Sequence, residues 1–179
     1  MDHDYAEGMR LLRGSRVEKY NDTGLEGPAA VFDGYTLPKT FFEGVIARGL
    51  GEKDTAARAF AAAQRMVQAD MEQWPDDAKA IALLGTLHAL RGNKEDAIRA
   101  GQRAMELLPI SKDAYDGPLL ATKLAVIYAQ VGEVDRAIEL LADLMKTPNG
   151  PTPGTLRVEP EWEPLRGDPR FEKLADTGA

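Results

Sequence analysis

The stretch that decides the fold is AKAIALLGTLHALRGNKEDAIRAGQRAMELLP, residues 78–109. The turn Arg91-Gly92-Asn93 predicts the end of one helix, because glycine takes the left-handed conformation that closes a helix C-terminus. Asn93 is placed to cap the helix that follows. Gly85 is expected where the two helices cross, since a larger side chain would push the backbones beyond the usual separation of about 8–10 Å. This stretch therefore predicts a helical hairpin.

The same stretch resembles the tetratricopeptide repeat, a helical hairpin of about 34 residues with a recurring pattern of large, small and proline positions. The residues that match the pattern are Leu84, Gly85, Ala97, Ala104 and Pro109. Three positions depart from it, because Ile81, His88 and Gly101 replace its tryptophan, tyrosine and phenylalanine.

Residues 118–149 repeat this register, and a weaker copy runs from about Leu37 to Gln73. The matching residues of the later copy are Leu124, Ala125, Tyr128, Ala137 and Leu141. Those of the earlier copy are Gly44, Ala56, Phe60 and Ala63, whereas Glu43 and Ala47 depart from the pattern. Three hairpins are about the minimum for a stable stack, because each buries its apolar face against its neighbours.

We therefore expect an all-α fold, a right-handed α-α superhelix of about three tetratricopeptide-like hairpins with a C-terminal capping tail. The hairpins are expected at about 37–76, 77–111 and 117–149. Residues 1–36 are expected to contain a short helix over Tyr5–Leu12 and an irregular lead-in. Residues 151–179 are expected to form a tail packed on the repeats, with a short helix after Asp168-Pro169. Apolar residues recur at steps of three and four positions from Phe60 to Trp74. This spacing predicts one long helix from about Asp54 to Gln73.

The composition of the chain limits the kinds of fold, partner and chemistry that we expect. Hydrophobic residues make up 44% and aromatic residues 7% of the 179 residues, which favours closely packed helices over a sheet. The formal net charge of -7 repels phosphate backbones and anionic lipid headgroups, so neither nucleic acid nor a membrane is an expected partner. The absence of cysteine excludes disulfides, thiolate nucleophiles and cysteine-bound metals. Because a signal peptide and an apolar span of membrane length are both missing from this sequence, a cytoplasmic location is favoured.

The sequence offers little for catalysis or metal binding. Its two histidines are His3, near the N-terminus, and His88, which is expected to be packed or hydrogen-bonded on a helix face. Ser15 and Ser111 lack the Gly-x-Ser-x-Gly setting of an activated nucleophile. We expect no catalytic residue, no cofactor and no metal.

In tetratricopeptide proteins the first helix of each hairpin lines a concave groove that holds the ligand. The residues that the resemblance places there are Phe41, Val45, Arg48, Lys79, Ala82, Thr86, Leu90, Leu119, Thr122, Val126 and Gln130. Ordinary packing within the hairpins accounts equally well for Phe41, Leu90, Leu119 and Val126. The clamp of lysine, asparagine and arginine in chaperone-binding relatives is absent, which leaves Lys79, Lys123 and Arg48 as isolated cations. An apolar groove of this kind favours an amphipathic helix or an extended apolar segment.

The terminal stretch LRVEPEWEPLRGDPRF, residues 156–171, resembles the ending of many bacterial tetratricopeptide domains at the C-terminus of larger signalling proteins. The resemblance implies a sensor or scaffold segment. We therefore expect a non-catalytic module that binds a protein or peptide whose identity is unknown. A structural self-association element is the alternative, and an enzyme is a remote one. Tail anchors such as Trp162 and Phe171 are expected to cover the last hairpin, and the competing hypothesis places the tail in the groove as an inhibitor.

Overall fold

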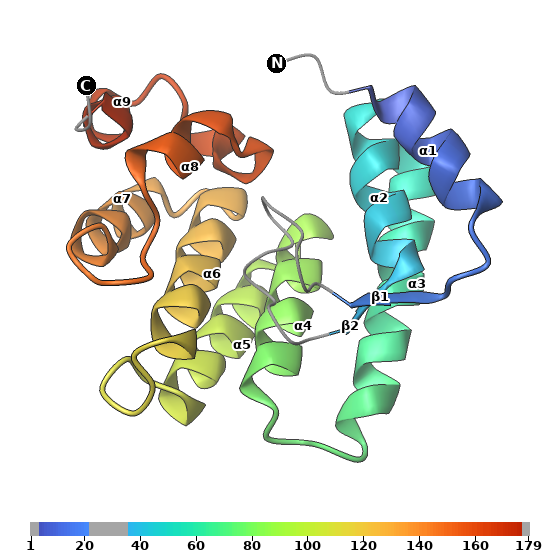
Figure 1. Cartoon of the computed structure of the whole chain (residues 1–179), viewed down its shortest axis with the longest axis horizontal. Helices are drawn as coiled ribbons and strands as arrows, with labels where there is room; N and C mark the ends of the chain where they lie inside the picture. Colours follow the sequence, from blue (N-terminus) through green and yellow to red (C-terminus); the bar gives the residue numbers. More distant parts are fainter. Residues whose placement is uncertain (1–3, 22–35, 177–179) are drawn as a thin grey trace.

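The computed structural model describes residues 4–21 and 36–176, and these residues are mostly helical, as expected for an all-α protein (Figure 1). The elements in chain order are α1 (Tyr5–Gly14), β1 (Lys19–Asn21), β2 (Thr36–Pro38), α2 (Lys39–Gly49), α3 (Lys53–Met71), α4 (Ala78–Leu90), α5 (Lys94–Leu107), α6 (Asp116–Gln130), α7 (Val134–Leu144), α8 (Pro153–Val158), the 3-10 helix η2 (Pro160–Leu165) and α9 (Pro169–Asp176). None of the helices in this part of the chain combines the length and the apolar character needed to cross a membrane.

Three helical hairpins, α2/α3, α4/α5 and α6/α7, follow one another within residues 39–144. Each turns at a glycine with positive φ, which is 76° at Gly51, 80° at Gly92 and 79° at Gly132. This confirms the left-handed turn predicted at Gly92, and the same conformation closes α6 at Gly132. The predicted cap is wrong, because the Asn93 side chain makes no capping hydrogen bond to α5. Its Nδ2 instead lies 3.4 Å from Nδ1 of the half-buried His88.

Glycines let neighbouring helices approach closely in the middle of the molecule. A Cβ atom built on Gly85 of α4 would lie 2.9 Å from Ile127 Cδ1 and 3.2 Å from the Ala97 carbonyl oxygen. A Cβ atom built on Gly101 of α5 would lie 2.8 Å from Leu124 Cδ1. Gly85 thus stands at a helix crossing, as its position predicts. The close approach of α5 to α6 also explains why Gly101 replaces the larger residue of the repeat pattern.

The first hairpin carries additions that the repeat pattern does not predict. Strands β1 and β2 pair antiparallel, with Lys19 opposite Pro38, and the Tyr20 ring packs edge-on against Phe42 at 5.6 Å between ring centres. The expected irregular lead-in therefore includes a short strand, and its remaining residues, 22–35, lie outside the described residues. The helix predicted over Tyr5–Leu12 is present as α1, which packs on α2.

The long helix α3 ends earlier than its apolar series predicts. It spans 19 residues and stops at Met71, and Trp74 follows it with 70% of its surface exposed. The predicted long helix is therefore confirmed, with its end two residues before Gln73, and Trp74 lies outside it. The chain leaves helical geometry before Trp74 and turns through Pro75 towards Asp77, whose carboxylate caps α4 by accepting from the backbone N–H groups of Lys79 and Ala80.

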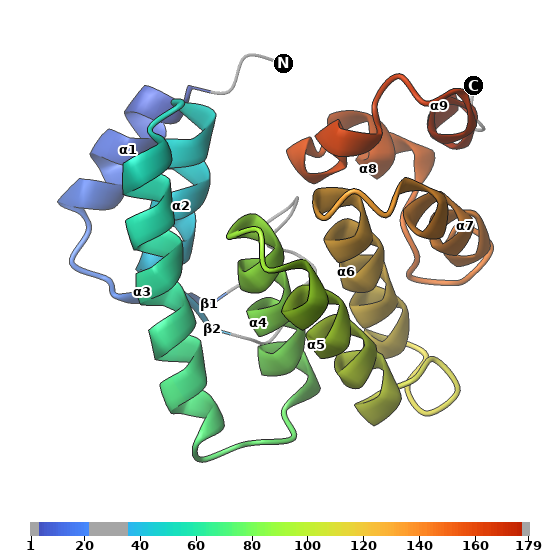
Figure 2. The same ribbon diagram turned by 180° about the vertical axis from the view of Figure 1, so that it is seen from behind.

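The tail folds against the last hairpin, as Figures 1 and 2 show for α8 and α9 beside α6 and α7. Helix α8 begins with a reciprocal capping box between Thr152 and Thr155. Trp162 and Phe171 are fully buried, in one apolar cluster with Leu141 of α7. The short helix expected after Asp168 is α9, whereas α8 and η2 were not predicted. The apolar face of the last hairpin is thus covered by the chain itself.

Candidate functional site: the polar contacts between α6 and the tail

Five of the predicted groove side chains are buried in the structure, and four of them lie on α4 and α6. Ala82 is 1% exposed, Thr86 5%, Thr122 6% and Val126 2%. The Thr86 hydroxyl donates to the Ala82 carbonyl, and the Thr122 hydroxyl donates to the Pro118 carbonyl one turn back in its own helix. These four residues therefore present almost no accessible surface, because they are packed in the core and the two hydroxyl groups bond within their own helices.

Phe41 belongs to the core of the first hairpin, where its ring packs against Phe42 and Phe60. Its burial matches the packing interpretation of this position. Val45, Leu90 and Leu119 are half-buried. Val45 and Leu90 pack at the edge of the same apolar cluster as Phe41.

The cations expected to be isolated all have partners. Lys79 of α4 forms an ion pair of 3.0 Å with Asp116 of α6. Arg48 Nη1 at the end of α2 donates to Gln130 Oε1 at the end of α6, at 3.0 Å. Two predicted groove residues, Arg48 and Gln130, are thus brought together from the first and third hairpins. Gln130 Nε2 in turn donates to the backbone carbonyl of Glu161 in η2, at 2.8 Å.

Lys123 is the centre of a buried charged group between α6 and η2. Its side chain is 2% exposed, and its Nζ lies 3.3 Å from Oε2 of Glu161, whose side chain is 9% exposed. One local feature of the sequence indicates this burial, because Lys123 lies within the apolar run of α6. Its partner is 38 residues away and could not be identified from spacing. A lysine is rarely buried without a carboxylate partner, because an unpaired charge removed from water is costly.

The two carboxyl groups of this cluster have raised pKa values. Burial raises the pKa of Glu161, and the opposing attraction of Lys123 does not cancel it. Burial is also the largest cause that raises the pKa of Glu159 to about 7, followed by the charge of Glu161. Lys123 and the neighbouring Trp162 indole lower it in part. Perturbed carboxyl groups of this kind are typical of functional sites.

Two buried polar atoms of the cluster, Glu161 Oε1 and Trp162 Nε1, make no hydrogen bond. The indole therefore lowers the pKa of Glu159 as a polar neighbour without meeting the geometry of a hydrogen bond. A buried acceptor and a buried donor without partners each cost free energy, about 1–3 kcal/mol. The docked tail is consequently held by apolar burial while its polar contacts are incompletely satisfied.

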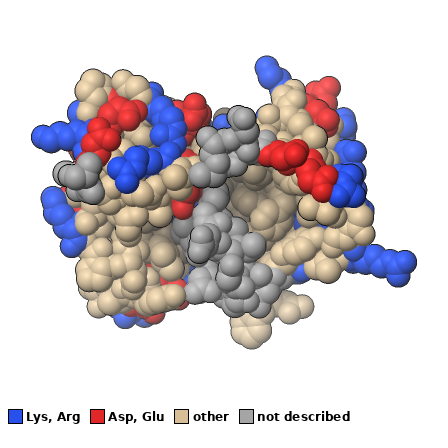
Figure 3. Space-filling view, turned by 45° about the horizontal axis from the view of Figure 1, so that its top comes forward, with Lys and Arg blue, Asp and Glu red and all other residues tan. Residues whose placement is uncertain are grey.

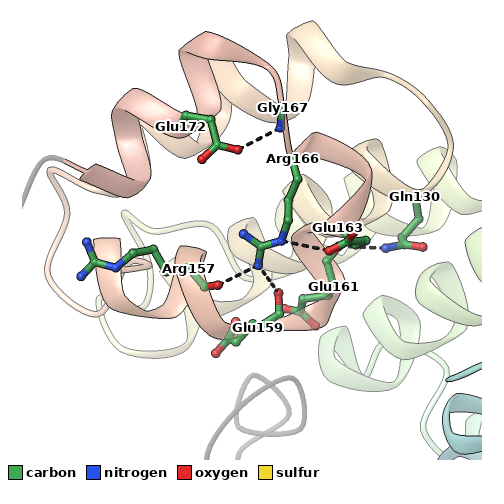
Figure 4. A network of polar contacts seen from close by, with 8 residues as sticks. All are labelled: Gln130, Arg157, Glu159, Glu161, Glu163, Arg166, Gly167 and Glu172. Carbon is green, nitrogen blue, oxygen red and sulfur yellow. Dashed lines mark hydrogen bonds and ion pairs between the residues drawn. The ribbon is translucent and has the colours of Figure 1, made fainter. Parts of the chain in front are cut away.

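A second set of contacts holds the tail segment in shape, and Figure 4 shows Arg166 at its centre. Arg166 donates to the Glu163 carboxylate and, through Nη2, to the backbone carbonyls of Arg157 and Glu159 at 2.8 and 3.5 Å. The Glu172 carboxylate accepts from the Gly167 N–H at 2.8 Å. These bonds hold α8, η2 and α9 in a fixed arrangement relative to one another, and η2 contacts α6.

The surrounding surface has mixed charge. On the face drawn in Figure 3, acidic and basic side chains intermingle along the upper rim, and uncharged side chains make up much of the lower part. Within residues 4–21 and 36–176, no group of three or more His, Cys, Asp or Glu side chains is arranged to hold a metal ion. The arrangement is suited to holding a peptide segment on a helix through an aromatic anchor, a main-chain contact and a charge.

Comparison of the sequence with protein-family models gave no match, and comparison with curated proteins also gave no match.

Proposed function

We propose that this chain is a non-catalytic protein- or peptide-binding module of the tetratricopeptide kind. In this proposal the hairpins stack as a right-handed superhelix, and the module is a regulatory or scaffold segment of a bacterial cytoplasmic protein. The observation that carries the proposal is the way in which α6 holds the segment 159–165 of the tail.

Three kinds of contact hold that segment. Trp162 inserts a fully buried ring beside α6 and α7. Gln130 binds the main chain of the segment at the Glu161 carbonyl, and Lys123 pairs with the Glu161 carboxylate. An aromatic anchor in a pocket, with polar groups that fix register and direction, is the general basis of peptide recognition on helical surfaces. In this proposal a partner segment binds the same face of α6 through the same three kinds of contact that hold the tail.

Binding of a library of 15-residue peptides to the full chain, measured by fluorescence anisotropy and then by calorimetry, tests the proposal. We expect peptides whose affinity falls about tenfold, or roughly 1.4 kcal/mol, in the Gln130→Ala and Arg48→Ala variants. Arg58→Ala is the matched control, because Arg58 is an exposed residue of α3 whose side chain bonds to Thr55. A library without binders, or binders indifferent to Gln130 and Arg48, would contradict the assignment of this face.

Light scattering over a concentration series addresses the self-association alternative. A monomer at all concentrations supports the binding module. Reversible dimerisation that is lost in the Gln130→Ala variant would mean that a second copy is the partner of this face.

A further inference from the structure

We infer that the turn between α3 and α4 is a binding site for an arginine side chain, with Trp74 as its aromatic surface and Asp76 as its carboxylate. The ligand is the guanidinium group of an arginine in an exposed segment of a partner protein. The turn lies at the lower edge of Figure 1, whereas the tail lies at the upper edge. The inference therefore does not rest on the contacts between α6 and the tail.

The indole of Trp74 is open to solvent, although tryptophan is a largely buried residue in most proteins. Trp74 follows the end of α3 at Met71 and is 70% exposed, whereas Trp162 is fully buried. Residues 74–77 line one open pocket on the surface. An exposed indole offers the face of its π system to a ligand, and tryptophan attracts cations more strongly than the other aromatic side chains do.

The charged side chains beside this turn leave an excess of negative charge. Asp76 pairs with Arg103 of α5, but the two atoms are 3.3 Å apart and the Asp76 side chain is 75% exposed. Arg103 also pairs with Glu106 at 3.5 Å, so that one guanidinium group serves two carboxylates. Glu72, exposed at the end of α3, adds a further carboxylate. A cationic ligand would reduce this excess of negative charge.

The other charges near the turn do not remove this preference for a cation. Lys79 of α4 pairs with Asp116 of α6 at 3.0 Å, and Lys19 of β1 pairs with Asp70 of α3 at 2.9 Å. Asp77 accepts from two backbone N–H groups at the positive start of α4. Helix α3 has no basic residue in its last turn, so its negative C-terminal end also favours a cation.

An arginine suits this turn better than a lysine does. A planar guanidinium group stacks on an aromatic face and donates paired hydrogen bonds to a carboxylate, whereas an ammonium group is compact and strongly hydrated. Trp74 supplies the face, and Asp76 supplies a carboxylate in the same pocket. The formal net charge of -7 also speeds the encounter with a basic segment.

A peptide titration followed by NMR on the isotope-labelled full chain tests the site. The sequence contains two tryptophans, so separate indole N–H signals report on Trp74 and on the buried Trp162. The probe is the blocked peptide acetyl-Ala-Arg-Ala-Arg-Ala-amide. We expect it to move the Trp74 signal and to leave the Trp162 signal in place. The analogue with glutamine at both arginine positions should move neither signal, and the lysine analogue should bind more weakly than the arginine peptide.

Substitutions separate this site from a general attraction to an acidic protein. Trp74→Ala should weaken binding of the arginine peptide about fivefold, as expected for loss of an exposed cation–π contact, with the Asp76 amide signal as the readout. Asp76→Asn should weaken it about threefold. Asp143→Asn is the matched control, because Asp143 of α7 is also an exposed aspartate paired with a cation, and its affinity should stay close to that of the parent chain.

Trp74→Leu keeps an apolar side chain without a π face and should lose as much affinity as Trp74→Ala, and circular dichroism checks that both variants are folded. The site would be overturned by a Trp74 signal that does not move, by equal responses to the arginine and glutamine peptides, or by unchanged affinity in the Trp74 variants. Equal weakening in Asp76→Asn and Asp143→Asn would also overturn it, since net charge alone would then explain binding. These outcomes do not involve Gln130 or Arg48, so this site and the proposed function can fail separately.

Discussion

Replacing Trp162 by alanine tests whether the tail belongs to the folded core. The indole is fully buried in a cluster with Leu141 and Phe171, and truncation of a large buried aromatic side chain costs about 3–5 kcal/mol. The native indole also carries an unsatisfied Nε1–H, whose burial costs about 1–3 kcal/mol. Trp162→Phe keeps most of the ring and removes that donor, so it should destabilise the chain clearly less than Trp162→Ala.

Thermal unfolding followed by circular dichroism measures both variants. For a chain of this size, 1 kcal/mol shifts the Tm by about 2–4 °C, so Trp162→Ala should lower it by roughly 6–20 °C. Trp74→Ala is the matched control, because Trp74 is exposed, and its Tm should stay within about 2 °C of the parent. An unchanged Tm in Trp162→Ala, or equal shifts in the two alanine variants, would refute the contribution of the tail to stability.

Further substitutions probe the helix crossing, the buried ion pair and a cap. Gly85→Leu should lower stability by about 1–3 kcal/mol or more, because its side chain would meet Ile127 and backbone atoms of α5, and an unaltered melting curve would contradict this close approach. Lys123→Ala should cost about 3–5 kcal/mol at pH 8 by leaving Glu161 unpaired. That loss should shrink as the pH falls, because burial raises the pKa of Glu161 and a proton can then neutralise the carboxylate in place of the lysine, and equal losses at pH 8 and pH 5 would argue against the pair. Asp77→Ala should cost about 1 kcal/mol in urea unfolding through loss of the α4 cap, and no change would show that water replaces it.

The parts of the fold that the sequence predicts are those with local causes. The turns at Gly92 and Gly132 are predictable because a positive φ favours glycine at a helix end. The position of Gly85 is predictable because a crossing of two adjacent helices excludes a side chain. Asn93 shows the limit of this reasoning, since a residue of the right type at a helix start bonds to His88 instead of the backbone.

The candidate site depends on contacts between residues far apart in the chain, which is why little of it was predictable. Lys123 and Glu161 are paired across 38 residues, and their pairing requires that the tail return along α6. The apolar character of Trp162 and Phe171 predicts docking of the tail on the last hairpin, as the structure shows, but not the polar contacts of the tail with Lys123 and Gln130. The two carboxyl groups acquire their raised pKa values only in the folded interface, where burial outweighs the lysine.

The bond between Arg48 and Gln130 has a mechanical consequence. It joins residues 82 positions apart and connects the first hairpin to the third, past the second. In helical solenoids each repeat contacts only its neighbours. Small rotations at each interface between repeats therefore add up to changes in the curvature of the whole molecule. In the superhelix that we propose, a direct link between non-neighbouring hairpins would oppose widening of the curve, because the bond must break before the first and third hairpins separate. Since Gln130 also holds the tail, widening of the curve and release of the tail would strain the same side chain.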